Sequence, residues 1–465
     1  MLYLRLLYSV LFPAIAGTCF VNLFLHKKED ATFLERIALG FCMGLMLITL
    51  EMFYVLSRLN IKFSLLSISL PLVPVILAGI FVTVKNKLID LRLPRIPNLS
   101  KFEIFLLIMI LFQVFFIFSS QMIKPVTGWD AWSLYSLYGK AYFLEGTSSV
   151  PALPPMIQRQ HTALSQTWIF TCIGQWNEIF GKLNFAFYYI SLIVLFYCAA
   201  RRSIPRMPAL LSTYFLCTLP FLVHHATLEY SDFMISIYLF IAVSLLFLWF
   251  NNKELRILAL SFICLLSTLT IKKESFFHIA IILIIFAFTV FSRKFKMNAE
   301  IKLVRYATVI SIFVGGLFMI IRFLILPYEG MKLVSTIDFS RIWPIITVFY
   351  DYLFIRDNWN IIWFVLLLLI VFNYNRLRIG FNLNLFGLVA LELFGFMIYY
   401  FLSDQATYSW LFFVTPAVRN MLQFMPVAIF FMANILTLEM PEFSVSKASL
   451  NINKDRPDNK QMRKK

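Results

Sequence analysis

The segment Ile104–Ser120, IFLLIMILFQVFFIFSS, contains a single glutamine before its two final serines. An apolar run of about 17 to 25 residues is long enough to cross the hydrocarbon core of a membrane as a helix. Such runs recur along the chain, which has 465 residues, 60% of them hydrophobic, and a mean hydropathy of +0.81. A transmembrane β-barrel would require short segments of alternating polarity, and the sequence does not show them. The sequence therefore predicts an all-α polytopic membrane protein.

The apolar runs predict about thirteen transmembrane helices. They are Leu2–Leu25, Phe33–Leu56, Ser64–Val84, Phe102–Ser120, Asn184–Ala200, Pro208–His224, Ser231–Phe250, Ile257–Thr270, Phe276–Phe291, Val304–Pro327, Trp359–Phe372, Phe381–Leu402 and Asn420–Leu438. The first is read as a retained helix, because Met1–Leu25 lacks the small-residue cleavage site of a signal peptide. Two connectors, 121–182 and 328–358, are too long for turns. Within them, Ala163–Phe180 and Ile342–Phe354 are predicted as interfacial helices on the outer face.

The formal net charge of +17 is concentrated in short connectors and at the C-terminal end. Its main contributors are Lys27, Lys28, Lys85, Lys87, Arg92, Arg95, Lys101, Arg201, Arg202, Arg206, Arg293, Lys294, Lys296, Arg376, Arg378, Arg463, Lys464 and Lys465. They lie between alternate apolar runs, as cytoplasmic connectors do, so they indicate membrane topology and no nucleic-acid partner. This topology places the N-terminus outside. It makes residues 441–465 a basic cytoplasmic tail, predicted to be disordered.

The six cysteines are scattered through apolar runs without CxxC spacing. They are interpreted as buried thiols, and they form neither a disulfide framework nor a zinc site.

The stretch Gly128-Trp129-Asp130-Ala131-Trp132 follows the run that ends at Ser120. Indole rings favour the membrane–water boundary, so Asp130 is expected there, partly desolvated and suited to proton abstraction. If the following segment is helical, Lys140 lies on the same side as Asp130. The alternative interpretation is an aromatic belt with an incidental aspartate.

The connector from His224 to Asp232 holds two imidazoles and the carboxylates of Glu229 and Asp232. Such a hairpin could bind a metal, a sugar or a diphosphate, or it could be a solvated turn. Asp232 is also a candidate cap for the helix that follows, because an aspartate near a helix start accepts backbone N–H bonds.

Two outer connectors carry cations against the positive-inside trend: Lys272 and Lys273, which precede Glu274, and Arg419. A lipid-linked phosphate would explain them, because ammonium and guanidinium groups neutralise phosphate oxygens. Snorkelling lysines and an interfacial anchor are the alternatives. A carboxylate and several cations on one membrane face fit transfer from a phosphorylated lipid. The base would act on the acceptor hydroxyl, and the cations on the departing phosphate.

The chain resembles the bacterial branch of the GT-C integral-membrane glycosyltransferases, relatives of protein O-mannosyltransferases and aminoarabinose transferases. The resemblance rests on Gly128-Trp129-Asp130-Ala131-Trp132 with Lys140-Ala141, Gln166-Thr167-Trp168 leading to Gly181-Lys182-Leu183, Glu229-Tyr230-Ser231-Asp232, Lys272-Lys273-Glu274, and Trp410 with Arg419, Gln423 and Pro426. It implies a GT-C-like core over residues 102–440, with residues 1–101 as extra N-terminal helices. It also implies Asp130 as the catalytic aspartate and a polyprenyl-phosphate sugar donor. Transfer, with inversion, would occur on the periplasmic face of a bacterial inner membrane, to a lipid, cell-surface glycan or protein.

The predicted substrate- and phosphate-binding residues are Trp129, Lys140, His161, Glu229, Asp232, Lys272, Lys273, Glu274 and Arg419. Related sequences carry an Asp-Tyr-Pro-like element where this chain has Ile157-Gln158-Arg159, and Thr-Lys-Asn-Glu-Gly where it has Ile271-Lys272-Lys273-Glu274-Ser275. No DxD pair stands in the first outer loop, so transfer without cofactor or metal is favoured, and a divalent metal is the less favoured option.

Two other functions compete with a transferase. A transporter or flippase of lipid-linked glycans predicts internal repeats and ionisable groups deep within helices. The sequence shows no convincing repeat, and its charges cluster at the outer ends of the apolar runs, with Glu51, Arg322 and Glu392 as the exceptions. A non-catalytic relative in an envelope assembly complex would explain the departures from the family's motifs.

Overall fold

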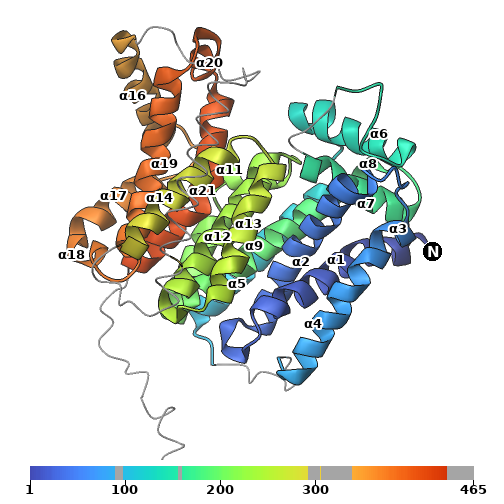
Figure 1. Cartoon of the computed structure of the whole chain (residues 1–465). Coiled ribbons are helices and arrows are strands. Elements are labelled where there is room, and N and C mark those ends of the chain that lie inside the picture. Colours follow the sequence, from blue (N-terminus) through green and yellow to red (C-terminus); the bar gives the residue numbers. More distant parts are fainter. Residues whose placement is uncertain (89–97, 155–159, 292–303, 305–337, 437–465) are drawn as a thin grey trace, which may run out of the picture.

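The computed structural model describes residues 1–88, 98–154, 160–291, 304 and 338–436. The regular structure of these residues is helical and includes no β-strand (Figure 1). Eight helical segments among them are long and apolar enough to cross a membrane. They are α1 (Leu2–Phe24), α2 (Phe33–Glu51) with the π-helical turn Met52–Leu56, α3 (Leu65–Ser69) with α4 (Val73–Lys85), α5 (Lys101–Ile123), α8 (Glu178–Gly181) with α9 (Leu183–Arg201), α12 (Ser231–Asn252), α19 (Asn382–Leu402) and α21 (Val414–Ile435). The prediction of an all-α membrane protein is thereby confirmed.

The predicted count of thirteen spans is not reached in the described residues. The predicted span Pro208–His224 is a pair of helices, α10 (Arg206–Cys217) and α11 (Pro220–Ala226), bent by 65°. Three predicted spans are shorter apolar helices: α13 (Leu255–Ser267) with its 3-10 turn to Thr270, α14 (Ser275–Phe291) and α17 (Ile362–Phe372). The predicted span Val304–Pro327 lies outside the described residues, as does the predicted tail 441–465.

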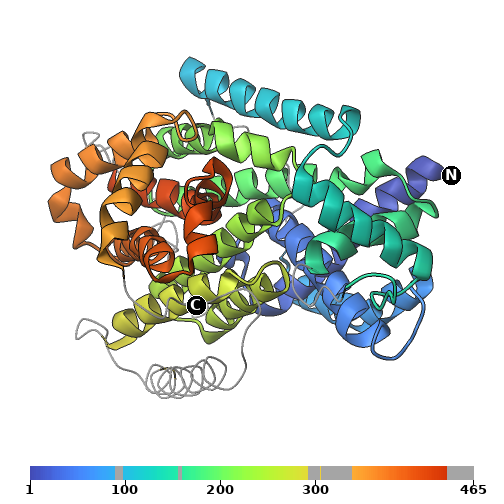
Figure 2. The same ribbon diagram turned by 90° about the horizontal axis from the view of Figure 1, so that it is seen from above.

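Two helices form the centre of the bundle. In both α12 and α21, 94% of the most apolar 18-residue stretch is buried inside the protein, whereas only 22% of the corresponding stretch of α5 is buried. Figure 2 shows α5 lying along one edge of the molecule, where its leucine and phenylalanine side chains are exposed as in a helix that faces lipid. Because α12 and α21 are central, polar side chains at their ends are held by neighbours on several sides.

The N-terminal helices pack through glycine. A Cβ on Gly17 of α1 would lie 1.8 Å from the carbonyl oxygen of Gly40, and one on Gly44 would lie 1.8 Å from that of Pro13. The two backbones can approach this closely because glycine has no side chain, as in other small-xxx-small contacts between membrane helices. Helix α2 in turn contacts α7 (Gln160–Ile173) and α9. Residues 1–88 are therefore packed directly on the following helices.

The two ends of the bundle differ. One end carries α18 (Tyr374–Leu377) and the basic connectors, several of which pair with the few acids there: Arg256 with Asp30 at 2.6 Å, Arg202 with Glu35 at 2.5 Å and Arg206 with Glu103 at 2.6 Å. The opposite end carries α6 (Leu137–Glu145), α16 (Ile342–Tyr350) and α20 (Gln405–Trp410) (Figure 1). We call this second end the α16 end.

A helix forms in each of the two segments predicted as interfacial, and the position of α16 relative to a membrane stays a prediction. Helix α16 leaves Trp343 72% exposed while it buries Ile345 and Phe349, so it has one apolar face inward and another outward. The prediction of an interfacial helix at Ala163–Phe180 is wrong, because α7 is buried along almost its whole length. Its polar side chains find partners inside the protein, as in the hydrogen bond from the Thr167 hydroxyl to the carbonyl oxygen of Gly139 at 3.1 Å.

Candidate functional site

A cavity of about 430 Å³ opens at the α16 end, between α14, α19, α20 and α21. Its polar side includes four residues predicted from the sequence to act together, Asp130, Lys272, Lys273 and Arg419, and also Glu274. Aromatic side chains supply much of the remaining wall: Phe277, Phe396, Tyr399, Tyr400 and Trp410. The cavity thus places charged groups beside an apolar surface, as an amphiphilic ligand requires.

Asp232 binds two of the cations on the charged side of the cavity. It lies in the first turn of α12 and is completely buried. Its Oδ1 accepts hydrogen bonds from Lys272 Nζ at 2.8 Å and from Gln423 Nε2 at 2.5 Å, and its Oδ2 accepts one from Arg419 Nε at 2.8 Å. The interpretation of Asp232 as a helix cap is therefore wrong: Tyr230 is the N-cap, and the carboxylate accepts from side chains of α21 and of the turn that precedes α14.

Arg419 joins the two aspartates. Its Nη2 lies 2.6 Å from Asp130 Oδ2 and 2.7 Å from Asp232 Oδ2, and its guanidinium carbon lies 4.5 Å from the centroid of the Tyr230 ring. A Cβ on Gly128 would lie 2.6 Å from Cε1 of the same ring, so glycine permits the turn before Asp130 to rest on Tyr230. Asp130 is thus positioned by its own turn and by Arg419, and 21% of its side chain is exposed.

Lys272 supplies the second buried cation. Only 7% of its side chain is exposed, and its Nζ also lies 3.7 Å from Glu274 Oε1. Burial lowers the pKa of Lys272, but the carboxylates of Asp232 and Glu274 outweigh it, so the pKa lies above its usual range and the group stays charged. The site therefore combines fixed positive groups with two partly exposed carboxylates, Asp130 at 21% and Glu274 at 23% of the side chain.

The polar network continues from the cavity into the bundle. Gln423 donates to Asp232 and accepts at its Oε1 from His278 Nε2 at 2.5 Å, and His278 Nδ1 lies 2.9 Å from both oxygens of Glu392. Since an ionised carboxylate only accepts, the amide nitrogen of Gln423 must face Asp232. His278 Nε2 must then donate, and the remaining proton of the pair is shared between His278 Nδ1 and Glu392.

No protein-family model, curated protein or solved structure matches the chain. The resemblance to GT-C glycosyltransferases thus stays a prediction from the motifs. The described residues include no group of three His, Cys, Asp or Glu side chains arranged to hold a metal ion.

Two predicted site residues lie at the same end of the bundle but outside the cavity. Lys140 places its Nζ 4.2 Å from the centroid of the Trp176 ring, a cation–π contact at the surface. Trp129 is 73% exposed and packs its ring against Trp132 at 5.7 Å between centroids. Both arrangements suit a membrane surface, and neither residue lines the cavity.

The other two lie in the interior. His161 bonds through its ring nitrogens to the hydroxyls of Thr49 and Tyr188, each at 2.7 Å, and burial lowers its pKa to about 3. Glu229 is 1% exposed, its oxygens have no hydrogen-bond partner in the described structure, and burial raises its pKa to about 8 although Lys182 opposes this. Neither residue is brought to the cavity.

The sequence assigns no role to several residues of the cavity and of the polar network behind it. His278 and Glu392 lie inside apolar runs, and Gln423 enters only as part of a motif. The signal for all three is a polar residue within an apolar helix, because such a group must find a partner in the bundle. Tyr399 and Trp410 carry no such signal, since aromatic residues are common at helix ends in membranes.

Proposed function

We propose that the chain is a membrane glycosyltransferase that moves a sugar from a polyprenyl-phosphate donor to a hydroxyl of a lipid, cell-surface glycan or protein. One observation carries the proposal. An accessible carboxylate, Asp130, lies in one cavity with Lys272, Lys273 and Arg419, beside an aromatic wall. The resemblance adds the donor class, the inversion and the periplasmic face of a bacterial inner membrane.

In the proposed reaction Asp130 acts as the base. Its carboxylate takes the proton of the acceptor hydroxyl while that oxygen attacks the anomeric carbon of the sugar. The bond between this carbon and the phosphate oxygen breaks, and its electron pair leaves with the polyprenyl phosphate. Lys272 and Arg419 stabilise the charge that develops there, since preorganised cations act strongly in a site with little water. The aromatic wall would contact the apolar part of the donor.

The charged side chains of the site balance one another, and this bears on how a donor would bind. Three carboxylates face three cations: Asp130, Asp232 and Glu274 against Lys272, Lys273 and Arg419. A phosphate must therefore compete with a carboxylate for a cation. The Arg419–Asp130 pair is the more accessible of the two that Arg419 makes, with 21% of the Asp130 side chain exposed and none of Asp232. Phosphate that replaced Asp130 on Arg419 would free the base at the moment the donor is bound.

Replacing Asp130 by Asn tests the proposal. The amide cannot take a proton, so the variant is expected to abolish transfer while the protein stays folded in the membrane. The readout is mass spectrometry of lipid-linked and surface glycans in cells with the wild-type protein, the variant or neither. Asp351→Asn is the matched control, because Asp351 lies at the same end in an exposed pair with Arg356 at 2.5 Å. Glycans equal to wild type in the Asp130→Asn cells would refute the assignment.

A transporter of lipid-linked glycans is the second candidate, and the pair of His278 and Glu392 favours it. Both side chains are almost completely buried within apolar helices, where ionisable groups often serve proton-coupled movement. Flipping of a fluorescent lipid-linked sugar in proteoliposomes separates the two functions. A transporter would lose flipping in Glu392→Gln, whereas a transferase shows no flipping in any variant.

A further inference from the structure

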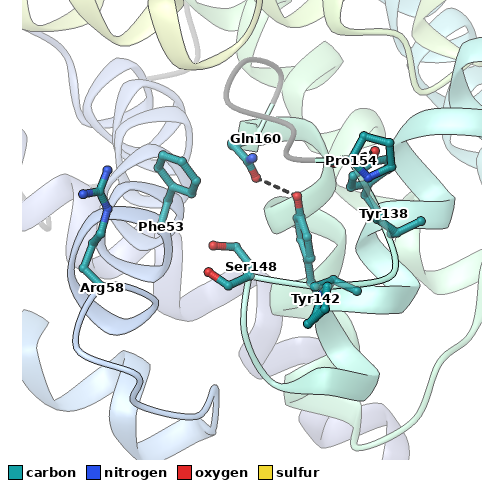
Figure 3. A pocket seen from close by; sticks show the side chains of 11 residues that line it. Phe53, Arg58, Tyr138, Tyr142, Ser148, Pro154 and Gln160 are labelled. Carbon is teal, nitrogen blue, oxygen red and sulfur yellow. Dashed lines mark hydrogen bonds between the residues drawn. The ribbon is translucent and has the colours of Figure 1, made fainter.

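A second cavity, of about 460 Å³, lies at the same end of the bundle and takes no part in the proposed chemistry. It is bounded by the end of α2, by α6, by the loop after α6 and by the start of α7 (Figure 3). Its volume lies in the range of about 300 to 1,000 Å³ that small-molecule sites occupy. The cavity thus lies between residues 53–58, which follow α2 among the helices predicted as additions to the GT-C-like core, and α6 and α7, which belong to the predicted core.

Hydrogen bonds connect the walls of this cavity to one another. Helix α6 ends at Gly146, which adopts a left-handed backbone conformation with φ of 66° and turns the chain toward the loop. The carbonyl oxygen of Gly146 accepts from the Phe63 backbone nitrogen at 2.8 Å, and the Ser148 hydroxyl donates to Ser57 Oγ at 2.7 Å. The segment that follows α2 and the loop that follows α6 therefore form one structure. A cavity held in this way is formed before any ligand binds.

The lining is chemically mixed. Three aromatic side chains line the cavity, Phe53, which is half-buried, and Tyr138 and Tyr142, which are buried. Gln160, which is 4% exposed, accepts a hydrogen bond from the Tyr142 hydroxyl at 3.0 Å through its Oε1. Its Nε2 has no hydrogen-bond partner among the described residues. Figure 3 shows Gln160 and Tyr142 across the cavity from Phe53 and Arg58.

The charge of the lining is positive. Arg58 forms no ion pair with a carboxylate in the described part of the chain, and no Asp or Glu is among the lining residues that the structure describes. Such a lining rejects cations and accepts neutral or acidic groups. Aromatic faces with nearby amide, hydroxyl and guanidinium donors are suited to a sugar, which has apolar C–H faces and a rim of hydroxyls.

One continuous stretch of chain connects the two cavities. Asp130 lines the first, the π-helical turn Ala131–Ser136 follows it, and Tyr138 and Tyr142 of α6 line the second. Eight to twelve residues separate them, or about 12 to 18 Å at 1.5 Å per helical residue. A chain of sugars could reach from one cavity to the other along this stretch.

We propose that the second cavity binds a carbohydrate, a neutral or acidic sugar unit of the acceptor that lies away from the reacting hydroxyl. The sugar stacks on the half-buried ring of Phe53, lies against Tyr138 and Tyr142, accepts a hydrogen bond from Gln160, and turns its most negative group toward Arg58. The assignment to the acceptor rests on the proposed function, whereas the binding of carbohydrate does not.

The test is a binding measurement that needs no catalysis. Saturation-transfer NMR with the purified full-length protein in detergent would use trisaccharides of hexose, N-acetylhexosamine and uronate as probes. Ser149→Trp, on the exposed part of the lining, is expected to obstruct the cavity and weaken the best probe at least about tenfold. Arg58→Gln is expected to weaken the uronate by about two- to fivefold, since an exposed charge pair is worth little more. Arg378→Gln, an exposed arginine at the α18 end, is the matched control and should change nothing.

Each outcome of these measurements either supports or overturns the assignment of a carbohydrate site. Failure of the wild-type protein to bind any of the three probes overturns the inference, and so does binding that Ser149→Trp leaves unchanged. Binding of glycerol 3-phosphate in place of all three sugars would assign the cavity to a phospholipid headgroup and overturn it too. Asp130→Asn is expected to retain sugar binding. If that variant also leaves the cell's glycans unaltered, the proposed transfer fails while the carbohydrate site stands.

Discussion

Replacing Asp232 by alanine is expected to destabilise the protein strongly, without any need for a substrate to observe it. The change removes three hydrogen bonds, from Lys272, Arg419 and Gln423. Arg419 keeps Asp130 as a partner, but Lys272 keeps only Glu274 at 3.7 Å and has just 7% of its side chain exposed. Breaking a buried pair by removing one partner costs about 3–5 kcal/mol, because the other charge stays desolvated. For a chain of this size this corresponds to a fall in Tm of about 3–5 °C.

The assay is thermal unfolding in detergent with a dye that becomes fluorescent on reacting with thiols. It suits this protein because five of its six cysteines are buried and become reactive only on unfolding. Asp130→Ala removes a carboxylate from the same guanidinium, but at a partly exposed position, so the expected loss is about 1 kcal/mol or less. Adding Lys272→Met to Asp232→Ala should restore much of the lost stability, since the unpaired ammonium is then gone. Equal Tm values for the two alanine variants, or no recovery in the double variant, would refute the reasoning.

Three further predictions concern other parts of the molecule. Because burial raises the pKa of Glu229 to about 8, the folded protein keeps a proton there that the unfolded chain loses near pH 4.5. Stability should therefore fall between about pH 4.5 and 8, by up to about 1.4 kcal/mol per pH unit, and Glu229→Gln should flatten this part of the Tm profile. Arg419→Lys cannot bridge both aspartates through separate nitrogens, so it should lower the glycan product measured by mass spectrometry by about 100-fold, whereas a role in anchoring alone predicts a wild-type level. Gly44→Leu should lower the Tm and the yield of folded protein, because the leucine would force α1 and α2 apart. Gly387→Ala is the control, since a Cβ on Gly387 meets only Ile285 Cδ1 at 3.0 Å. A similar Tm for the two variants would contradict the packing argument.

The sequence predicted the helical membrane architecture because apolar runs long enough to cross a membrane have few other stable solutions. It could not predict that Arg206–Cys217 and Pro220–Ala226 bend by 65°, since a break inside an apolar run leaves its composition unchanged. Nor could it predict that α7 is buried. The polar residues of that helix match an interfacial segment in composition, and only their hydrogen-bond partners, contributed by distant parts of the chain, show that they face the interior.

The candidate site was predictable in part for the same reason. Alternating topology assigns each connector to one end of the bundle, so Asp130, Lys272 and Arg419 were expected at the same end. Topology does not say which connectors touch within that end. The same reasoning assigns His161 and Glu229 to this end, yet neither lines the cavity: His161 bonds to Thr49 of α2 and Tyr188 of α9, and Glu229 is buried. Contacts between helices, which no single sequence shows, decide which of the predicted residues line the cavity.

The amide of Gln423 gives the network between the cavity and the centre of the bundle a polarity. It can sit only one way round while Asp232 is ionised, so its oxygen always points inward toward His278. Protonation of Asp232 would remove that constraint, because a protonated carboxyl group can donate, and the amide could then rotate by half a turn. The imidazole of His278 would then meet a donor in place of an acceptor and would have to give up its Nε2 proton. The protonation state of Asp232 is in this way linked to the tautomer of His278, which does not line the cavity.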